Sequence, residues 1–144
     1  MLAKYWRLRM VSDLDETLTY NNDARIAIRM MPWKIASGNL SYGTVITEDL
    51  DFGAAETIAN GVEVEGSVND NTSNLYWGIQ GTFEIIADVS GTGGTAYLYV
   101  EESDDNSTWP SDQADFDITD LECVATLAMS TDAVDEDRAV NFHF

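Results

Sequence analysis

An acidic stretch near residue 110 holds the side chains with the clearest capacity to bind a metal ion. Its oxygen-bearing residues are Asp104, Asp105, Asn106, Asp112, Asp115 and Asp117. Carboxylate and carbonyl oxygens are the ligands that Ca²⁺ takes, but an EF-hand also needs a glycine at its sixth position and a glutamate at its twelfth, so the spacing matches no EF-hand. We expect a turn built on Asp and Asn side chains, with a calcium site at Asp104, Asp105 and Asp112 as the alternative.

The motif Asp13-Leu14-Asp15-Glu16-Thr17 follows an apolar run near the N-terminus. Its D-x-D-x-T pattern is similar to the first motif of haloacid dehalogenase-type phosphatases. The resemblance implies that Asp13 is the nucleophile and Asp15 the general acid and base, with Mg²⁺ bridging carboxylate and phosphate. Such an enzyme also needs a downstream lysine and an α/β fold. Lys34 is the only lysine after the motif, and no βαβ pattern follows it. We therefore expect Asp13 and Asp15 to lie in a solvated turn, and the protein not to be an enzyme.

Aromatic side chains offer a third kind of chemistry, because exposed rings can stack on sugars. Tyr76, Tyr97 and Tyr99, together with Trp109 in the following loop, are the candidates for a glycan-binding platform. Tyrosines are also common at subunit interfaces, and an edge or an interface is the preferred interpretation. The single cysteine, Cys123, follows an apolar pattern in the strand around it, so we expect a small buried hydrophobe.

Charge is abundant and unevenly placed. The net charge is −19, which argues against nucleic acid as a direct ligand of the whole surface. Six of the seven basic residues fall within residues 1–34. If the first two strands pair, Arg7, Arg9, Arg25 and Arg29 would share one basic patch, and the planar guanidinium suits pairing with carboxylates at an interface. We expect that patch to contact an acidic surface of a neighbouring copy or another protein.

Apolar and polar residues alternate along most of the chain, which predicts strands. The clearest strands cover residues 75–89 and 95–101, and the loop Gly91–Gly94 between them is expected to reverse the chain. In the second of these strands we expect Tyr99 and Glu101 to face solvent. Further strands are expected at Lys4–Val11, Ala24–Met31, Thr44–Glu48, Gly61–Val68 and Leu121–Met129 and at the C-terminus, with Pro32 ending the second of them or placing it at a sheet edge.

Strands at this spacing, with turn residues between them, predict one domain over residues 1–144. Its expected fold class is all-β, a single antiparallel β-sandwich of about eight strands, either jelly-roll or immunoglobulin-like. The expected core comprises Trp77, Phe83, Ile85, Leu98, Leu127 and Phe142. No apolar run is long enough to span a membrane, so we expect no membrane contact and synthesis in a cytoplasm.

The strand entry DNTSNLY, the glycine-rich loop, the strand YLYVEES and the turn Ser103–Trp109 together resemble small β-sandwich structural proteins of tailed bacteriophages and related viruses. The resemblance covers about a third of the chain. Asn106 and Ser107 stand where those proteins usually have a glycine, and Asn tolerates the left-handed conformation that such a turn needs. The resemblance implies a non-enzymatic virion protein, an accessory subunit that decorates or completes the capsid or tail as an oligomer beside other virion proteins. The alternative is a carbohydrate- or receptor-binding module.

Overall fold

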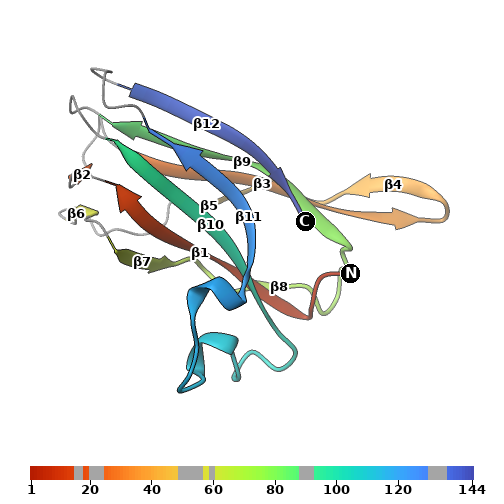
Figure 1. Cartoon of the computed structure of the whole chain (residues 1–144). Coiled ribbons are helices and arrows are strands. Elements are labelled where there is room, and N and C mark those ends of the chain that lie inside the picture. The colour runs from red at the N-terminus through yellow and green to blue at the C-terminus, as the bar shows by residue number, and fades with distance from the viewer. Residues whose placement is uncertain (15–17, 20–24, 49–56, 59–60, 88–92, 130–135) are drawn as a thin grey trace.

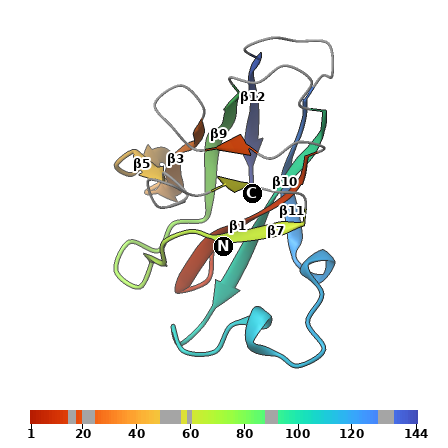
Figure 2. The same cartoon turned by 90° about the vertical axis from the view of Figure 1, so that its left-hand side faces the viewer.

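The computed structural model describes the chain except residues 15–17, 20–24, 49–56, 59–60, 88–92 and 130–135. Sheet I consists of β1 (Tyr5–Leu14), β7 (Val62–Glu65), β8 (Asn69–Asp70), β10 (Gly94–Ser103) and β11 (Glu122–Ala128). Sheet II consists of β3 (Arg25–Ala36), β4 (Asn39–Tyr42), β5 (Ile46–Glu48), β9 (Gly78–Ala87) and β12 (Glu136–His143). The two sheets are antiparallel and pack face to face (Figure 1 and Figure 2).

The prediction of an all-β antiparallel sandwich is confirmed, but the two sheets hold ten strands rather than about eight. The order is β11–β10–β1–β7 in sheet I and β12–β9–β3–β4 in sheet II. The two additional strands arise because two short strands, β7 and β8, pair with β1, and two short strands, β4 and β5, pair with β3. A separate short pair is formed by β2 (Leu18–Thr19) and β6 (Thr57–Ile58).

Alternation places the apolar side chains of both sheets in one core, as expected. In β1 the buried side chains are Trp6, Leu8 and Met10, and in β3 they are Ile26, Ile28 and Met30. The predicted core residues Phe83, Ile85, Leu98, Leu127 and Phe142 all belong to the same buried cluster. Burial of alternate residues on facing sheets is the arrangement that stabilises a sandwich.

Trp77 was wrongly assigned to the core, since 41 % of its surface is exposed. The predicted strand began too early. Before β9 the chain forms a loop that is fixed by Asn71, whose side chain donates to the carbonyl of Tyr76 at 3.2 Å and accepts from its N–H at 2.7 Å. Leu75 within this loop has a φ of 52°, which is not a strand conformation. The ladder therefore starts at Gly78, and alternation holds only from there.

β9 and β10 do not form the expected hairpin. β9 pairs with β3 and β12 in sheet II, whereas β10 pairs with β1 and β11 in sheet I. The chain therefore crosses from one sheet to the other between these strands, and Gly94 opens β10 with a φ of 92°. Alternation alone could not reveal this, because it fixes the buried face of a strand but not its neighbour.

Pro32 neither ends its strand nor lies on an edge strand, since β3 continues to Ala36 between β9 and the pair β4 and β5. The Pro32 carbonyl accepts from Gly43 N at 2.8 Å. The N and C=O of a strand residue point to the same side, so the proline nitrogen also faces Gly43, in the gap between β4 and β5. The missing donor therefore costs no ladder hydrogen bond to β9.

Cys123 is exposed rather than buried. The reason is a β-bulge: Leu98 pairs with Ala125, while the next residue, Tyr99, pairs with Cys123, so that Val124 is an extra residue. One extra residue inverts the alternation on its N-terminal side. Ala125 and Leu127 thus face the core, whereas Cys123 faces outward.

Candidate functional site

The phosphatase motif is not assembled into a site by the described residues. Asp13 lies within β1, opposite Thr95, and is exposed; it is in a strand rather than the predicted turn. Asp15 and Thr17 lie outside the described residues. Lys34 lies near the end of β3, where its ammonium donates to the carbonyl of Asn74 at 2.6 Å. The end of β3 that leads into β4 and the tip of β1, near which Asp13 lies, are at opposite ends of the molecule (Figure 1). The lysine therefore cannot steady a phosphate held at Asp13.

The acidic turn uses its carboxylates to hold its own backbone. Asp105 accepts from the N–H of Ser107 at 2.9 Å and of Thr108 at 2.8 Å, and these bonds hold the pKa of its carboxyl well below the usual range. Asp112 accepts from Trp109 N at 2.9 Å. Asn106 has a φ of 60°, the left-handed conformation expected of it. Among the described residues, no group of three or more His, Cys, Asp or Glu side chains could hold a metal ion, so Asp104, Asp105 and Asp112 do not converge on one.

Arg7 and Arg9 belong to an ion-pair network on the outer face of sheet I. The Arg7 Nε donates to Glu101 at 2.6 Å, its guanidinium also pairs with Glu65, and it lies 4.2 Å from the centre of the Trp109 ring. Arg9 pairs with Glu63 at 3.1 Å and with Glu65 at 3.4 Å. Arg7 is only 7 % exposed. These arginines are thus already neutralised within the chain.

Glu101 binds the segment that follows β10, residues 104–121, to the outer face of sheet I. It is fully buried and accepts from Ser111 N at 2.7 Å as well as from Arg7. Burial alone would raise the pKa of Glu101, but the bonds from Ser111 and Arg7 hold it below its usual value. The segment carries two short 3₁₀ turns, η1 (Pro110–Asp112) and η2 (Ile118–Asp120). Because it covers β10, Glu101 and Tyr99 are buried, contrary to the expectation that they face solvent.

The four arginines do not form one patch. β1, which carries Arg7 and Arg9, is in sheet I, and β3, which carries Arg25 and Arg29, is in sheet II. The expected pairing of these two strands is therefore wrong. The side chain of Arg25 lies outside the described part of the structure, while Arg29 is exposed.

The tyrosines do not form one platform either. Tyr97 and Tyr99 are neighbours, with ring centres 6.4 Å apart, but Tyr99 is 8 % exposed and Trp109 is 6 % exposed. Tyr76 lies elsewhere, 5.3 Å from the ammonium of Lys34. The rings proposed for stacking on a sugar are thus separated or covered.

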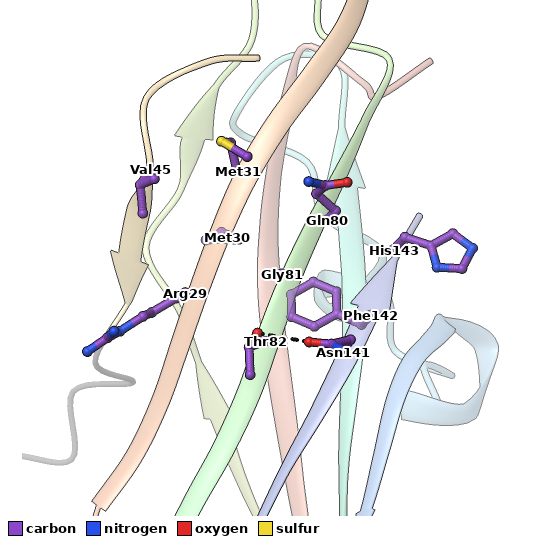
Figure 3. A pocket seen from close by; sticks show the side chains of 10 residues that line it. All are labelled: Arg29, Met30, Met31, Val45, Gln80, Gly81, Thr82, Asn141, Phe142 and His143. Carbon is purple, nitrogen blue, oxygen red and sulfur yellow. Dashed lines mark hydrogen bonds between the residues drawn. The ribbon is translucent and has the colours of Figure 1, made fainter. Parts of the chain in front are cut away.

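The outer face of sheet II carries a groove of about 540 Å³ (Figure 3). Two cross-strand rows line it: Arg29, Thr82 and Asn141 in one, and Met31, Gln80 and His143 in the other. Thr82 Oγ1 donates to Asn141 Oδ1 at 3.1 Å. In contrast to Arg7 and Arg9, Arg29 makes no ion pair with any described residue. The groove therefore presents the cationic Arg29 beside amide and hydroxyl groups.

A hairpin arm, which we define as residues 33–42, projects beyond the sandwich (Figure 1). Its two-residue turn has φ values of 53° at Ser37 and 81° at Gly38, as a type I′ turn requires. Cross-strand pairing places Trp33 beside Tyr42 and Ile35 beside Leu40 on one face. Ile35, Leu40 and Tyr42 are 44 %, 55 % and 47 % exposed.

The interpretation of the sequence missed this arm, although two signals were present. The dipeptide Ser37-Gly38 separates two short alternating runs. In addition, residues 35–47 contain no charged side chain, in a chain where 23 % of the residues are charged.

A buried carboxyl lies where β5 of sheet II approaches β8 of sheet I. Glu48 is 6 % exposed, and its Oε1 accepts from Asn69 Nδ2 at 3.3 Å. Its Oε2 is buried without a hydrogen-bond partner among the described residues. Burial raises the pKa of Glu48, and bonds from Asn69 and Ser67 offset only part of that rise. No sequence signal distinguished this glutamate from the many exposed ones.

The described residues include no helix long and apolar enough to cross a membrane. Comparisons of the chain with protein-family models, with curated proteins and with solved structures gave no match.

Proposed function

We propose that this protein is a non-enzymatic structural subunit that assembles with other copies through its hairpin arm. The observation that carries this proposal is the arm's exposed apolar face, formed by Ile35, Leu40 and Tyr42. Soluble monomers rarely expose contiguous apolar side chains, and where they do, the patch usually marks a contact with another protein. The arm also places this patch away from the acidic sandwich.

Charge supports the same proposal. Two copies that each carry a net charge of −19 repel one another over most of their surfaces. Residues 35–47 are uncharged, so the arm is where copies can approach at the least electrostatic cost. Salt further screens the repulsion between the two sandwiches, over roughly 8 Å at physiological ionic strength.

The biological setting that we propose is a tailed-virus particle, in which the subunit decorates or completes the capsid or tail beside other virion proteins. The support is the sequence resemblance over the region from Asp70 to Asp112, in which the turn at Asn106 adopts the left-handed conformation that the related turns require. We further propose that the sandwich is of the jelly-roll or immunoglobulin-like type, and that the subunit contacts neither nucleic acid nor membrane directly.

Oligomer mass as a function of concentration tests the assembly. We expect sedimentation velocity or light scattering to show oligomers that dissociate on dilution, and Ile35→Glu to abolish them while the circular dichroism spectrum stays unchanged. Gln113→Glu is the matched control, because it adds the same charge at an exposed site of the segment that covers sheet I. Wild-type protein that stays monomeric at all concentrations, and that binds no particle, would refute the proposal.

The groove on sheet II favours a second candidate, a carbohydrate- or receptor-binding module. The specific observation is the guanidinium of Arg29, which makes no ion pair within the described part of the chain and lies beside Thr82 and Asn141, a set of groups that can bind hydroxyl and carboxylate oxygens. Titration calorimetry with oligogalacturonates tests it. Binding that is lost in Arg29→Ala, in a protein that is otherwise monomeric, would favour this candidate over the structural subunit.

A further inference from the structure

We propose that β4 pairs with β4 of a second copy, antiparallel and about a two-fold axis, so that Leu40 of each copy lies opposite Tyr42 of the other. This inference rests on the proposed assembly and specifies its partner, its symmetry and its register. The pairing joins two copies of sheet II into one continuous sheet.

Hydrogen bonding to β3 alternates along β4. Ala36 and Asn39 flank the two-residue turn, and residues in that position exchange hydrogen bonds with each other. Gly43 N bonds to the Pro32 carbonyl at 2.8 Å, which confirms the same alternation four residues further on. Asn39, Ser41 and Gly43 therefore direct their backbone groups toward β3. Leu40 and Tyr42 direct theirs outward, where β4 is the last strand of its sheet.

The edge strands β11, β7 and β12 carry features that discourage pairing with a foreign strand, and β4 does not. β11 has a bulge at Val124 and a charge at Glu122, and β7 carries Glu63 and Glu65. β12 begins with the charged run from Glu136 to Arg138. Charged side chains, prolines and bulges are the usual means of blocking an edge. The sequence of β4, Asn-Leu-Ser-Tyr, contains none of them.

The partner that best fits this edge is a second copy. Two-fold pairing matches a strand with itself and closes after two copies, so it needs no other complementary surface. Antiparallel pairing places the two sandwiches at opposite ends of the paired arms, which separates the two acidic bodies. The opposed Leu40 and Tyr42 side chains also lie on one face, where an apolar cross-strand pair stabilises the sheet.

One register uses every free group. With Ser41 on the two-fold axis, Leu40 and Tyr42 of each copy meet Tyr42 and Leu40 of the other in hydrogen-bonded pairs. Centring on Leu40 would place Tyr42 opposite Gly38, which is in the turn. Centring on Tyr42 would place Leu40 opposite Thr44, which is outside β4. In the favoured register the two Ser41 residues form a non-hydrogen-bonded pair, with Cα atoms about 4.5 Å apart.

Cysteine crosslinking tests the register directly. In a Cys123→Ser background, Ser41→Cys should form a disulfide-linked dimer under mild oxidation, because a Cα separation of about 4.5 Å suits a disulfide. Asn39→Cys is the matched control: its position lies opposite Gly43 of the other copy, so crosslinking should be at least tenfold slower. Equal rates for both variants would overturn the register.

A proline substitution tests the backbone pairing. Leu40→Pro removes an N–H that faces outward and leaves the bonds to β3 intact, whereas Leu40→Ala keeps this N–H and shortens the side chain. We expect the dimer dissociation constant to rise on the order of a hundredfold for Leu40→Pro, and clearly less for Leu40→Ala, with unchanged circular dichroism for both. If the two variants lose affinity equally, the arms pack through their faces, and the edge pairing is wrong.

The two proposals fail in distinguishable ways. A wild-type protein that is monomeric throughout would refute the assembly and this inference together. A wild-type protein that assembles, but whose Leu40→Pro variant assembles equally well, would refute the edge pairing alone.

Discussion

Replacement of Glu48 by glutamine is expected to stabilise the protein at neutral and higher pH. The Glu48 carboxyl is 6 % exposed, and only one of its oxygens has a hydrogen-bond partner among the described residues. An ionised carboxylate in that position loses water and is only partly compensated. Glutamine has nearly the same shape and carries no charge. We expect a gain of about 1–2 kcal/mol in the free energy of unfolding at pH 8, the range for an incompletely satisfied buried polar group.

The sign of the pH dependence follows from the direction of the pKa shift. The pKa of Glu48 is raised in the folded state. Well below the unfolded pKa, the carboxyl is protonated in both states, so its ionisation costs no stability. As the pH rises above the unfolded pKa, the unfolded chain loses this proton first, and stability falls until the folded pKa is passed. The advantage of Glu48→Gln over wild type should therefore be near zero at pH 4 and grow toward pH 8.

Urea unfolding at a series of pH values measures this difference. The comparison is made with wild type at each pH, because repulsion among the many other carboxylates changes with pH in both proteins. Glu122→Gln is the control, since Glu122 is exposed, and its difference from wild type should stay flat. A Glu48→Gln profile that runs parallel to wild type, or that loses ground as the pH rises, would contradict the reasoning.

Three further perturbations follow from the core, the ion-pair network and the acidic motif. Phe83→Ala, which deletes a fully buried ring, should cost about 3–5 kcal/mol in urea unfolding, and a cost below about 1 kcal/mol would mean that the core is misassigned. Glu101→Ala leaves Arg7 buried without its main partner, so we expect the free energy of unfolding to fall by about 3–5 kcal/mol. Limited proteolysis within residues 104–121 should also become faster, and unchanged cleavage would contradict the role of Glu101 in holding this segment on sheet I. Asp13→Asn should change stability by less than about 1 kcal/mol, because Asp13 is exposed, and Mg²⁺-dependent phosphate ester hydrolysis that this substitution abolishes would restore the phosphatase hypothesis.

The sequence predicted the features that depend on local alternation, above all which face of each strand is buried. The inward faces of β1, β3 and β10 follow from apolar residues at every second position, and the structure confirms them. The turn at Asn106 was also predictable, since its conformation depends on the residue itself. The sandwich architecture follows from the number and spacing of such strands.

The errors concern contacts between distant parts of the chain. Alternation does not specify neighbours, so the hairpin between β9 and β10 and the shared arginine patch were both wrong. Burial of Tyr99 and Glu101 depends on a covering segment that begins several residues later, and exposure of Cys123 depends on one extra residue in a ladder. These features arise from tertiary packing and register, which a single strand pattern does not contain.

The position of β1 in sheet I has a consequence for the order in which the chain can fold. β1 precedes every other strand of the two sheets, yet it pairs along its whole length with β10, with Leu8 opposite Val100. β3 in sheet II likewise pairs with β9, and β12, which follows every other strand of the two sheets, completes its own sheet. Each central strand also has nearer partners, β4 and β5 for β3 and β7 and β8 for β1, but these ladders are short. The long ladders must wait for strands that follow much later in the chain. Folding is therefore expected to be slow, with the apolar faces of β1 and β3 left partly uncovered until these distant strands pair.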